Sequence, residues 1–240
     1  MTISYKQTKI NYTTKNNGQN ALLFLHGWGG STLSFVGLSN AIDDNTTKHI
    51  LVDFPPFGES AEPKCPWTVE DYAIMIKQIL DQEKVKKVTI IAHSFGGRVA
   101  IYLANLYTYI VEKMLITGGA GIKPKNSLKR FFRKIKYKII RLFKKNANVG
   151  SSDYVKLSNV MKKTFSNIVE FDQTEMSKSV LCPVLLVYGQ KDKETPLYMA
   201  KKLNRNIKNS ELIVLKKCGH FAYIQQFAKF VNITKIFIKE

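Results

Sequence analysis

The sequence predicts an α/β fold in which a mostly parallel sheet has helices on both faces and carries an inserted helical cap. Short runs rich in β-branched and other apolar residues recur along the chain, as expected for strands covered on both faces. Segments with helical spacing alternate with these runs, which favours parallel connections. Between about residues 120 and 179 the pattern is purely helical, which predicts the cap.

The expected elements follow one another in a regular order. The first segment, residues 3–14, alternates weakly and ends in Asn16-Asn17-Gly18, a turn signal that predicts a hairpin between two strands. The remaining strands are expected at residues 21–25, 49–54, 87–92, 111–117, 184–188 and 211–215, and helices at 68–80, 99–107 and 198–203.

Length and composition are those of a single globular domain with an inserted subdomain. With 240 residues, of which 45% are hydrophobic and 23% charged, the chain can bury a substantial core. We expect residues 1–119 and 180–240 to form this core and residues 120–179 to form the cap. Because the N-terminal stretch is polar and no apolar run approaches the roughly 18 residues that cross a bilayer, we expect neither a signal peptide nor a membrane span, and we expect a cytoplasmic location.

The cysteines point to neither a disulfide framework nor a metal. There are three of them, an odd number, and they are widely spaced along the chain: Cys65, Cys182 and Cys218. This pattern fits free thiols, and we expect no bound metal and no cofactor.

One strand ends in a serine that is flanked by small residues. Ser94 follows the strand at 87–92 and precedes a helical pattern that continues to Tyr107. Ala92, Gly96 and Gly97 allow the backbone to turn sharply at this point. The turn pushes the serine hydroxyl outward above the sheet, which is the position that a nucleophile requires.

A serine nucleophile needs a base, and one histidine is the best candidate. His220 lies in a loop after the strand at 211–215, from which a mobile imidazole can reach Ser94. His26 stays open as an alternative base, although its place beside the glycine loop 27–30 favours a hydrogen bond that holds this loop. The other two histidines are interpreted as structural: His49 and His93.

The base in turn needs an orienting carboxylate, and Asp192 has little competition for this role. It follows the strand at 184–188 by a few residues and lies in a loop, as His220 does. Asp53 also ends a strand, but Pro55 and Pro56 follow it closely. We therefore expect Asp53 to cap this turn by accepting backbone N–H bonds.

With these segments the chain resembles the α/β-hydrolase family. His26-Gly27-Trp28-Gly29-Gly30 is similar to the oxyanion loop of that family, and Ala92-His93-Ser94-Phe95-Gly96 is similar to its nucleophile elbow. Residues 53–60, 189–192 and 219–221 also resemble family segments, and the order Ser, Asp, His is the family's order. Two departures are Ala92, in place of the first glycine of G-x-S-x-G, and Pro56, in place of a glycine; alanine is still small enough for the elbow.

The resemblance implies an eight-stranded type of sheet and a carboxylesterase-like serine hydrolase. Ser94 would attack a carbonyl of an ester or thioester, His220 would take its proton, and Asp192 would orient the imidazole. The resemblance places the oxyanion donors at the backbone N–H groups of Trp28 and Phe95. We also expect Gly27, Trp28 and Phe221 to line the substrate pocket.

The linkage that is cleaved stays open at this point. The acyl group, the leaving group and the oligomeric state cannot be read from the sequence. Carbon–carbon bond hydrolysis and perhydrolysis use the same triad. A non-catalytic binding protein with a hydrolase fold is the alternative of a different class.

The net charge of +19 is concentrated in the predicted cap. Residues 123–145 contain eleven Lys or Arg and no Asp or Glu. At roughly 100° per residue, seven apolar side chains between Leu128 and Phe143 fall within an arc of about 120°, and only Tyr137 and Ile140 lie outside it, which predicts an amphipathic basic helix. Its basic face would be solvated above an apolar pocket, or meet an acidic acyl-carrier protein, or lie on an anionic membrane as in a lipase. Nucleic acid is a weaker alternative, because no recognition motif accompanies the charge.

Overall fold

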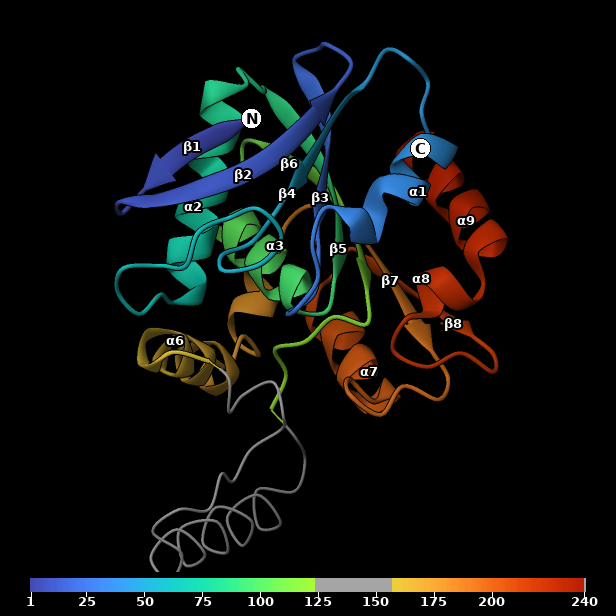
Figure 1. Ribbon diagram of the computed structural model, residues 1–240. Coiled ribbons are helices and arrows are strands. Elements are labelled where there is room, and N and C mark those ends of the chain that lie inside the picture. The colour runs from blue at the N-terminus through green and yellow to red at the C-terminus, as the bar shows by residue number, and fades with distance from the viewer. Residues whose placement is uncertain (124–156, 240) are drawn as a thin grey trace, which may run out of the picture.

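A computed structural model of the chain describes residues 1–123 and 157–239. Its centre is an eight-stranded sheet of order β1-β2-β4-β3-β5-β6-β7-β8 (Figure 1). The two pairings that involve β2 are antiparallel and the other five are parallel. The predicted fold class is therefore confirmed. The strands are β1 Thr2–Tyr5, β2 Thr8–Lys15, β3 Asn20–Leu25, β4 Lys48–Val52, β5 Lys87–His93, β6 Val111–Thr117, β7 Val184–Gly189 and β8 Ser210–Leu215.

The N-terminal hairpin lies elsewhere than predicted. β1 and β2 form it around Lys6 and Gln7, whose φ angles of 45° and 58° suit a tight turn. β2 then pairs with β4, so Asn16-Asn17-Gly18 connects two strands that are not neighbours. The reason is burial: β3 is buried from Ala21 onward and lies between β4 and β5, where no place is left for β2.

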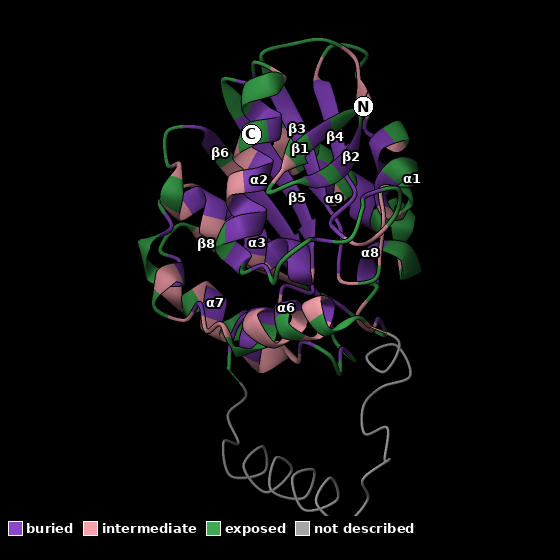
Figure 2. Ribbon diagram, turned by 60° about the vertical axis from the view of Figure 1, so that its left-hand side comes forward, coloured by how far each residue is buried: buried purple, intermediate pink, exposed green. Residues whose placement is uncertain are grey.

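Helices cover both faces of the sheet, as predicted, and each face has its own buried cluster. On one face pack α2 Val69–Gln82, α3 Phe95–Leu106 and α7 Leu197–Asn206, and on the other α1 Leu33–Ala41, α8 Ala222–Gln225 and α9 Phe227–Lys239. Figure 2 shows the buried strands between these layers. α2 begins at a capping box in which Thr68 accepts from the Asp71 N–H and Asp71 accepts from the Thr68 N–H.

The described part of the predicted cap contains one full helix. α6 Asn159–Glu170 is followed by the short 3-10 helix η1 Met176–Ser179, and α6 lies at the end of the sheet where the parallel strands terminate (Figure 1). Thr164 and Asn167 fix α6 to the core, since Thr164 Oγ1 accepts from the Trp67 N–H at 3.0 Å and Asn167 Nδ2 donates to the Trp67 carbonyl at 3.1 Å. The basic helix predicted at 123–145 falls almost wholly outside the described residues, and the division into core and cap stays a prediction.

Two further expectations concern thiols and membranes. Cys65, Cys182 and Cys218 are all free, as predicted. Within residues 1–123 and 157–239, no helix has both the length and the apolar character needed to span a bilayer.

Candidate active site

Ser94 stands at a strained turn between β5 and α3. Its φ and ψ angles of 49° and −108° lie in a region that non-glycine residues rarely occupy, and such strain is typical of functional positions. The turn is so tight that a Cβ on Gly96 would come within 2.1 Å of the Leu25 carbonyl oxygen. A Cβ on Gly97 would come within 2.8 Å of Ile116. Gly96 and Gly97 are therefore required, the first by the backbone of β3 and the second by the Ile116 side chain of β6.

The glycine loop after β3 passes directly beside the serine. A Cβ on Gly27 would come within 2.8 Å of His93 Nδ1 and 3.3 Å of Ser94 Cβ, so the close approach of this loop favours glycine there. Trp28 follows, and its ring contacts Phe57, Phe95 and Phe165, with centroids 4.9 to 5.8 Å away. Among the described residues none accepts a hydrogen bond from the backbone N–H of Trp28 or Phe95. Both groups are therefore available as donors.

His26 holds the glycine loop, which is the role that its position favours. Phe54 N–H donates to His26 Nε2 at 2.9 Å, so the ring proton is on Nδ1, which donates to the Gly27 carbonyl at 2.7 Å. Burial lowers the pKa of His26 to about 4. With both nitrogens occupied and the ring neutral, His26 is not positioned to act as a base.

Asp53 caps its turn, also as predicted. Its carboxylate accepts from the backbone N–H groups of Thr32 at 2.7 Å and Glu59 at 3.0 Å, and from the Asn11 side chain at 2.9 Å. Gly58, with φ of +59°, lies so close that a Cβ would overlap Asp53 at 2.2 Å. The loop after β4 thus wraps around this carboxylate.

Asp192 and His220 form a hydrogen-bonded pair. His220 Nδ1 lies 2.9 Å from Asp192 Oδ2, and the carboxylate side chain is fully buried. The backbone N–H groups of Glu194 and Thr195 both donate to Oδ1 at 2.9 Å. Burial alone would raise the pKa of Asp192, but hydrogen bonds from His220 and Thr195 outweigh it and hold this pKa below its usual value. The ionised carboxylate therefore fixes the imidazole with its proton on Nδ1.

Thr195 is a member of this network that sequence reasoning missed. Its hydroxyl lies 2.8 Å from Asp192 Oδ2, 3.0 Å from the Gly118 carbonyl and 3.3 Å from His220 Nδ1. The spacing Asp-x-x-Thr before Pro196 is a turn signal that could have pointed to it. Gly118, with φ of +55°, is also required, because a Cβ there would lie 3.1 Å from His220 Nδ1.

His93 holds the backbone of the candidate base. Its Nε2 lies 3.2 Å from the His220 carbonyl oxygen, and the two rings lie 4.7 Å apart. Burial lowers the pKa of His93 to about 3, so this ring is neutral. Because a carbonyl oxygen accepts, His93 donates from Nε2 and thereby positions the loop that carries His220.

A cavity of about 520 Å³ lies at the carboxyl ends of the strands, next to the groups described above. Ser94 and His220 both border it, although no hydrogen bond links the Ser94 hydroxyl to the His220 ring. Hydrogen bonds of this kind often form only when substrate is bound. Asp192 lies behind His220, and the other predicted site residues line the cavity: Gly27, Trp28, Phe95 and Phe221.

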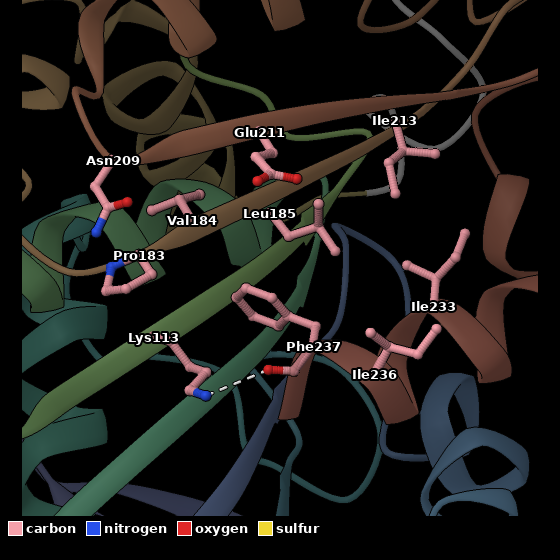
Figure 3. A pocket seen from close by; sticks show the side chains of 10 residues that line it. All are labelled: Lys113, Pro183, Val184, Leu185, Asn209, Glu211, Ile213, Ile233, Ile236 and Phe237. Carbon is pink, nitrogen blue, oxygen red and sulfur yellow. Dashed lines mark hydrogen bonds between the residues drawn. The ribbon is translucent and has the colours of Figure 1, made fainter. Parts of the chain in front are cut away.

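A second hollow, of about 350 Å³, shares no lining residue with this cavity. Figure 3 shows it from close by. It is formed by the first residues of β6, β7 and β8 together with the end of α9, and its walls are mostly apolar. Lys113 borders it and donates to the Phe237 carbonyl at 3.3 Å. Because parallel strands present their ligands at the carboxyl ends, this hollow is at the wrong end of the sheet for the chemistry of Ser94.

A mostly parallel sheet with a serine at a strained strand-to-helix turn is the architecture of an α/β-type hydrolase. Residues 20–153 match the family described as the alpha/beta hydrolase fold, and residues 162–234 match the family described as TAP-like protein. The first match covers more than half of the chain. The protein belongs to the alpha/beta hydrolase fold family and is by class a hydrolase.

Individual relatives span nearly the full chain at low identity. A 2-hydroxy-6-oxononadienedioate/2-hydroxy-6-oxononatrienedioate hydrolase of Burkholderia vietnamiensis is 23% identical over 97% of this chain and 92% of its own length. An esterase of Exiguobacterium antarcticum superposes with a TM-score of 0.77 at 21% identity, covering 97% of this chain and 96% of its own. A meta-cleavage product hydrolase of Pseudomonas fluorescens superposes with a TM-score of 0.76 at 20% identity, covering 100% and 97%.

Proposed function

We propose that the protein is a serine hydrolase that cleaves carboxylic ester or thioester bonds through Ser94, His220 and Asp192. The observation that carries the proposal is the hydrogen bond between His220 Nδ1 and the buried Asp192 carboxylate, beside the cavity that Ser94 lines. A serine hydroxyl becomes nucleophilic only next to a base of this kind. No cofactor enters the proposed reaction.

The reaction would proceed in two halves through an acyl-enzyme. Ser94 Oγ attacks the carbonyl carbon while His220 Nε2 takes the hydroxyl proton, and the same nitrogen then protonates the leaving alcohol or thiol. Water repeats the attack on the acyl-serine and releases the acid. The N–H groups of Trp28 and Phe95 would stabilise the oxyanion, and loss of one such donor typically raises the barrier by about 3 kcal/mol.

Ser94→Ala and a fluorophosphonate probe test the proposal together. We expect the wild type to hydrolyse short p-nitrophenyl esters and to carry the probe on Ser94, located by mass spectrometry of the labelled peptide. Ser94→Ala should lose both properties with an unchanged circular dichroism spectrum. Ser34→Ala, which removes another hydroxyl from the same cavity, should keep the label. Equal ester hydrolysis by Ser94→Ala would remove Ser94 from the mechanism, and absence of labelling in the wild type would favour a non-catalytic binding protein.

Carbon–carbon bond hydrolysis is the second candidate. Of the relatives described above, one is named a hydrolase of a dienedioate, which is a dicarboxylic acid, and another is named a meta-cleavage product hydrolase. A ring-cleavage dienedioate, assayed by loss of its ultraviolet absorbance, separates the two candidates: turnover of the dienedioate but not of simple esters would favour carbon–carbon hydrolysis.

The partner of the basic segment 123–145 is a separate proposal. An acidic acyl-carrier protein would deliver a thioester on its phosphopantetheine arm, and an anionic membrane would deliver a lipid ester. Eleven cations within this segment support either partner. A salt-sensitive complex with acyl-carrier protein in gel filtration would support the first proposal, and a complex unaffected by salt would contradict it.

A further inference from the structure

Five large apolar side chains are exposed beside the mouth of the candidate active-site cavity. They are between 39% and 79% exposed and come from α1 and from the segment that follows His220. We call this group the mouth patch: Leu33, Val36, Phe221, Ile224 and Phe227. Single exposed apolar residues are ordinary on protein surfaces, but a contiguous group marks a binding surface.

The two halves of the mouth patch adjoin one another. α1, α8 and α9 lie on the same side of the sheet (Figure 1). The buried rings of Phe35 and Tyr223 lie 5.2 Å apart, so α1 and α8 pack against each other under the exposed residues. A Cβ on Gly37 would lie 3.8 Å from the Phe227 ring, which brings α1 against the start of α9. The exposed apolar residues therefore form one surface.

This surface also borders the cavity. Phe221 belongs to both, because it lines the cavity next to His220 and is half exposed. Ser34, the neighbour of Leu33 on α1, and Tyr223, the neighbour of Ile224 on α8, line the cavity as well. A ligand that covers the mouth patch would therefore contact the entrance to the candidate site.

The charge around the mouth patch is positive. The stretch 212–239 contains five lysines and no acidic residue, and the stretch 31–42 contains no charged residue. Lys216 and Lys217 are exposed, and Gln226 Nε2 donates to the Lys216 carbonyl at 2.8 Å, which ties this loop to the α8–α9 junction. Lys229 is exposed two residues after Phe227. Glu194 is the one carboxylate among the described residues that line the cavity.

We propose that the mouth patch docks the protein onto an anionic lipid surface, with the cavity entrance facing the lipid. Insertion of apolar side chains into the acyl boundary requires no directional partner, and the flanking lysines provide attraction to anionic headgroups. Lipid-dissolved acyl substrates would then reach the cavity without crossing water. The docking is independent of the proposed ester chemistry, since none of its contacts requires Ser94.

Vesicle sedimentation of the full chain tests the proposal. The vesicles are phosphatidylcholine alone or an equal mixture of phosphatidylcholine and phosphatidylglycerol. The test variant is Leu33→Gln with Ile224→Gln, and the matched control is Leu181→Gln with Ile236→Gln, which removes comparably exposed residues from elsewhere on the surface. Both variants keep residues 123–145, so any contribution of that basic segment cancels.

We expect the wild type and the control to bind the anionic vesicles and the test variant to bind them about tenfold more weakly. Ser94→Ala should bind as the wild type does, which separates this proposal from the proposed reaction. Hydrolysis of a soluble ester should be equal in the test variant and the wild type. Equal vesicle binding by the test variant, equal wild-type binding to pure phosphatidylcholine, or no wild-type binding would each overturn the proposal.

Discussion

The Asp192→Asn substitution tests how the candidate base is held. In the structure, Oδ1 accepts from two backbone N–H groups, while Oδ2 accepts from the Thr195 hydroxyl and from His220 Nδ1. An asparagine can keep its oxygen at the Oδ1 position and so keep both backbone bonds. Its NH₂ group then occupies the Oδ2 position, 2.9 Å from His220 Nδ1.

The amide would force the histidine into the wrong tautomer. Two N–H groups cannot face each other at this distance, so the imidazole must present a lone pair at Nδ1 and carry its proton on Nε2. A protonated Nε2 cannot take the proton of Ser94. This change is expected to lower kcat about 10⁴-fold, equivalent to about 5 kcal/mol of barrier.

The measurement is kcat for a p-nitrophenyl ester, with Asp172→Asn as the matched control. Asp172 also accepts from a backbone N–H and a threonine hydroxyl, in this case those of Thr174, but it is remote from the imidazole. The control should keep wild-type kcat. If Asp192→Asn is folded by circular dichroism and its kcat stays within tenfold of the wild-type value, the hydrogen bond between Asp192 and His220 does not fix the tautomer of His220.

Three further predictions concern the surrounding structure. Thr195→Val removes the hydroxyl that lies 2.8 Å from Asp192 Oδ2 and should lower kcat about tenfold with little change in KM. Thr195→Ser keeps the hydroxyl and should retain activity. Equal kcat for the valine and serine variants would count against a positioning role of Thr195. Gly96→Ala places a Cβ 2.1 Å from the Leu25 carbonyl oxygen and should lower the free energy of unfolding, measured in urea, by about 3 kcal/mol. Gly37→Ala, whose Cβ would lie 3.8 Å from the Phe227 ring, should not destabilise the protein. A Gly96→Ala protein as stable as the wild type would contradict the tight turn. Burial lowers the pKa values of His26 and His93 from 6.5 to about 4 and about 3, so below pH 6.5 the unfolded chain binds protons that the folded chain does not. The free energy of unfolding should therefore fall by up to about 2.7 kcal/mol per pH unit between pH 6 and pH 4, and a flat urea midpoint over this range would show that neither ring is buried and neutral.

The sheet was predictable because its central strands are buried on both faces. β5 is buried at every position after Lys87, so its apolar run shows plainly in the sequence. The pairing of β2 was not predictable from the turn signal, since Asn16-Asn17-Gly18 reports only that the chain reverses and not which strand becomes the neighbour. That choice depends on the burial of β3 between two parallel partners.

All three helices on one face were missed, and the two longer ones, α1 and α9, were missed for different reasons. α1 has no side-chain N-cap, and its buried residues are only Phe35, Leu38 and Ser39. The serines and the glycine among its apolar residues leave no clear helical period in the sequence. α9 keeps Ile236 exposed and Phe237 half-buried, which blurs the helical period of its apolar residues. Sequence periodicity identifies a helix well only where one face alone is apolar.

The residues of the candidate site were predictable because they follow the ends of parallel strands, but the contacts among them were not. Asp192 and Thr195 follow β7, and His220 follows β8, so their proximity follows from the strand order. The hydroxyl of Thr195 contacts a ring 25 residues away in the chain. No local pattern records that distance, which depends on how two loops close over the same edge of the sheet.

The four histidines differ in role because their surroundings differ, and all four lie in the described part of the chain. His49 is buried beside Ser39 Oγ at 2.7 Å, and His26 uses both nitrogens to hold the glycine loop. His93 lies 4.7 Å from the His220 ring, yet its low pKa, caused mainly by burial, keeps it uncharged. His220 alone among them bonds to a carboxylate. A ring that must gain a proton during a reaction needs a fixed negative charge to stabilise the imidazolium. The hydrogen bond to Asp192 therefore distinguishes the candidate base, His220, from His93, the ring in contact with it.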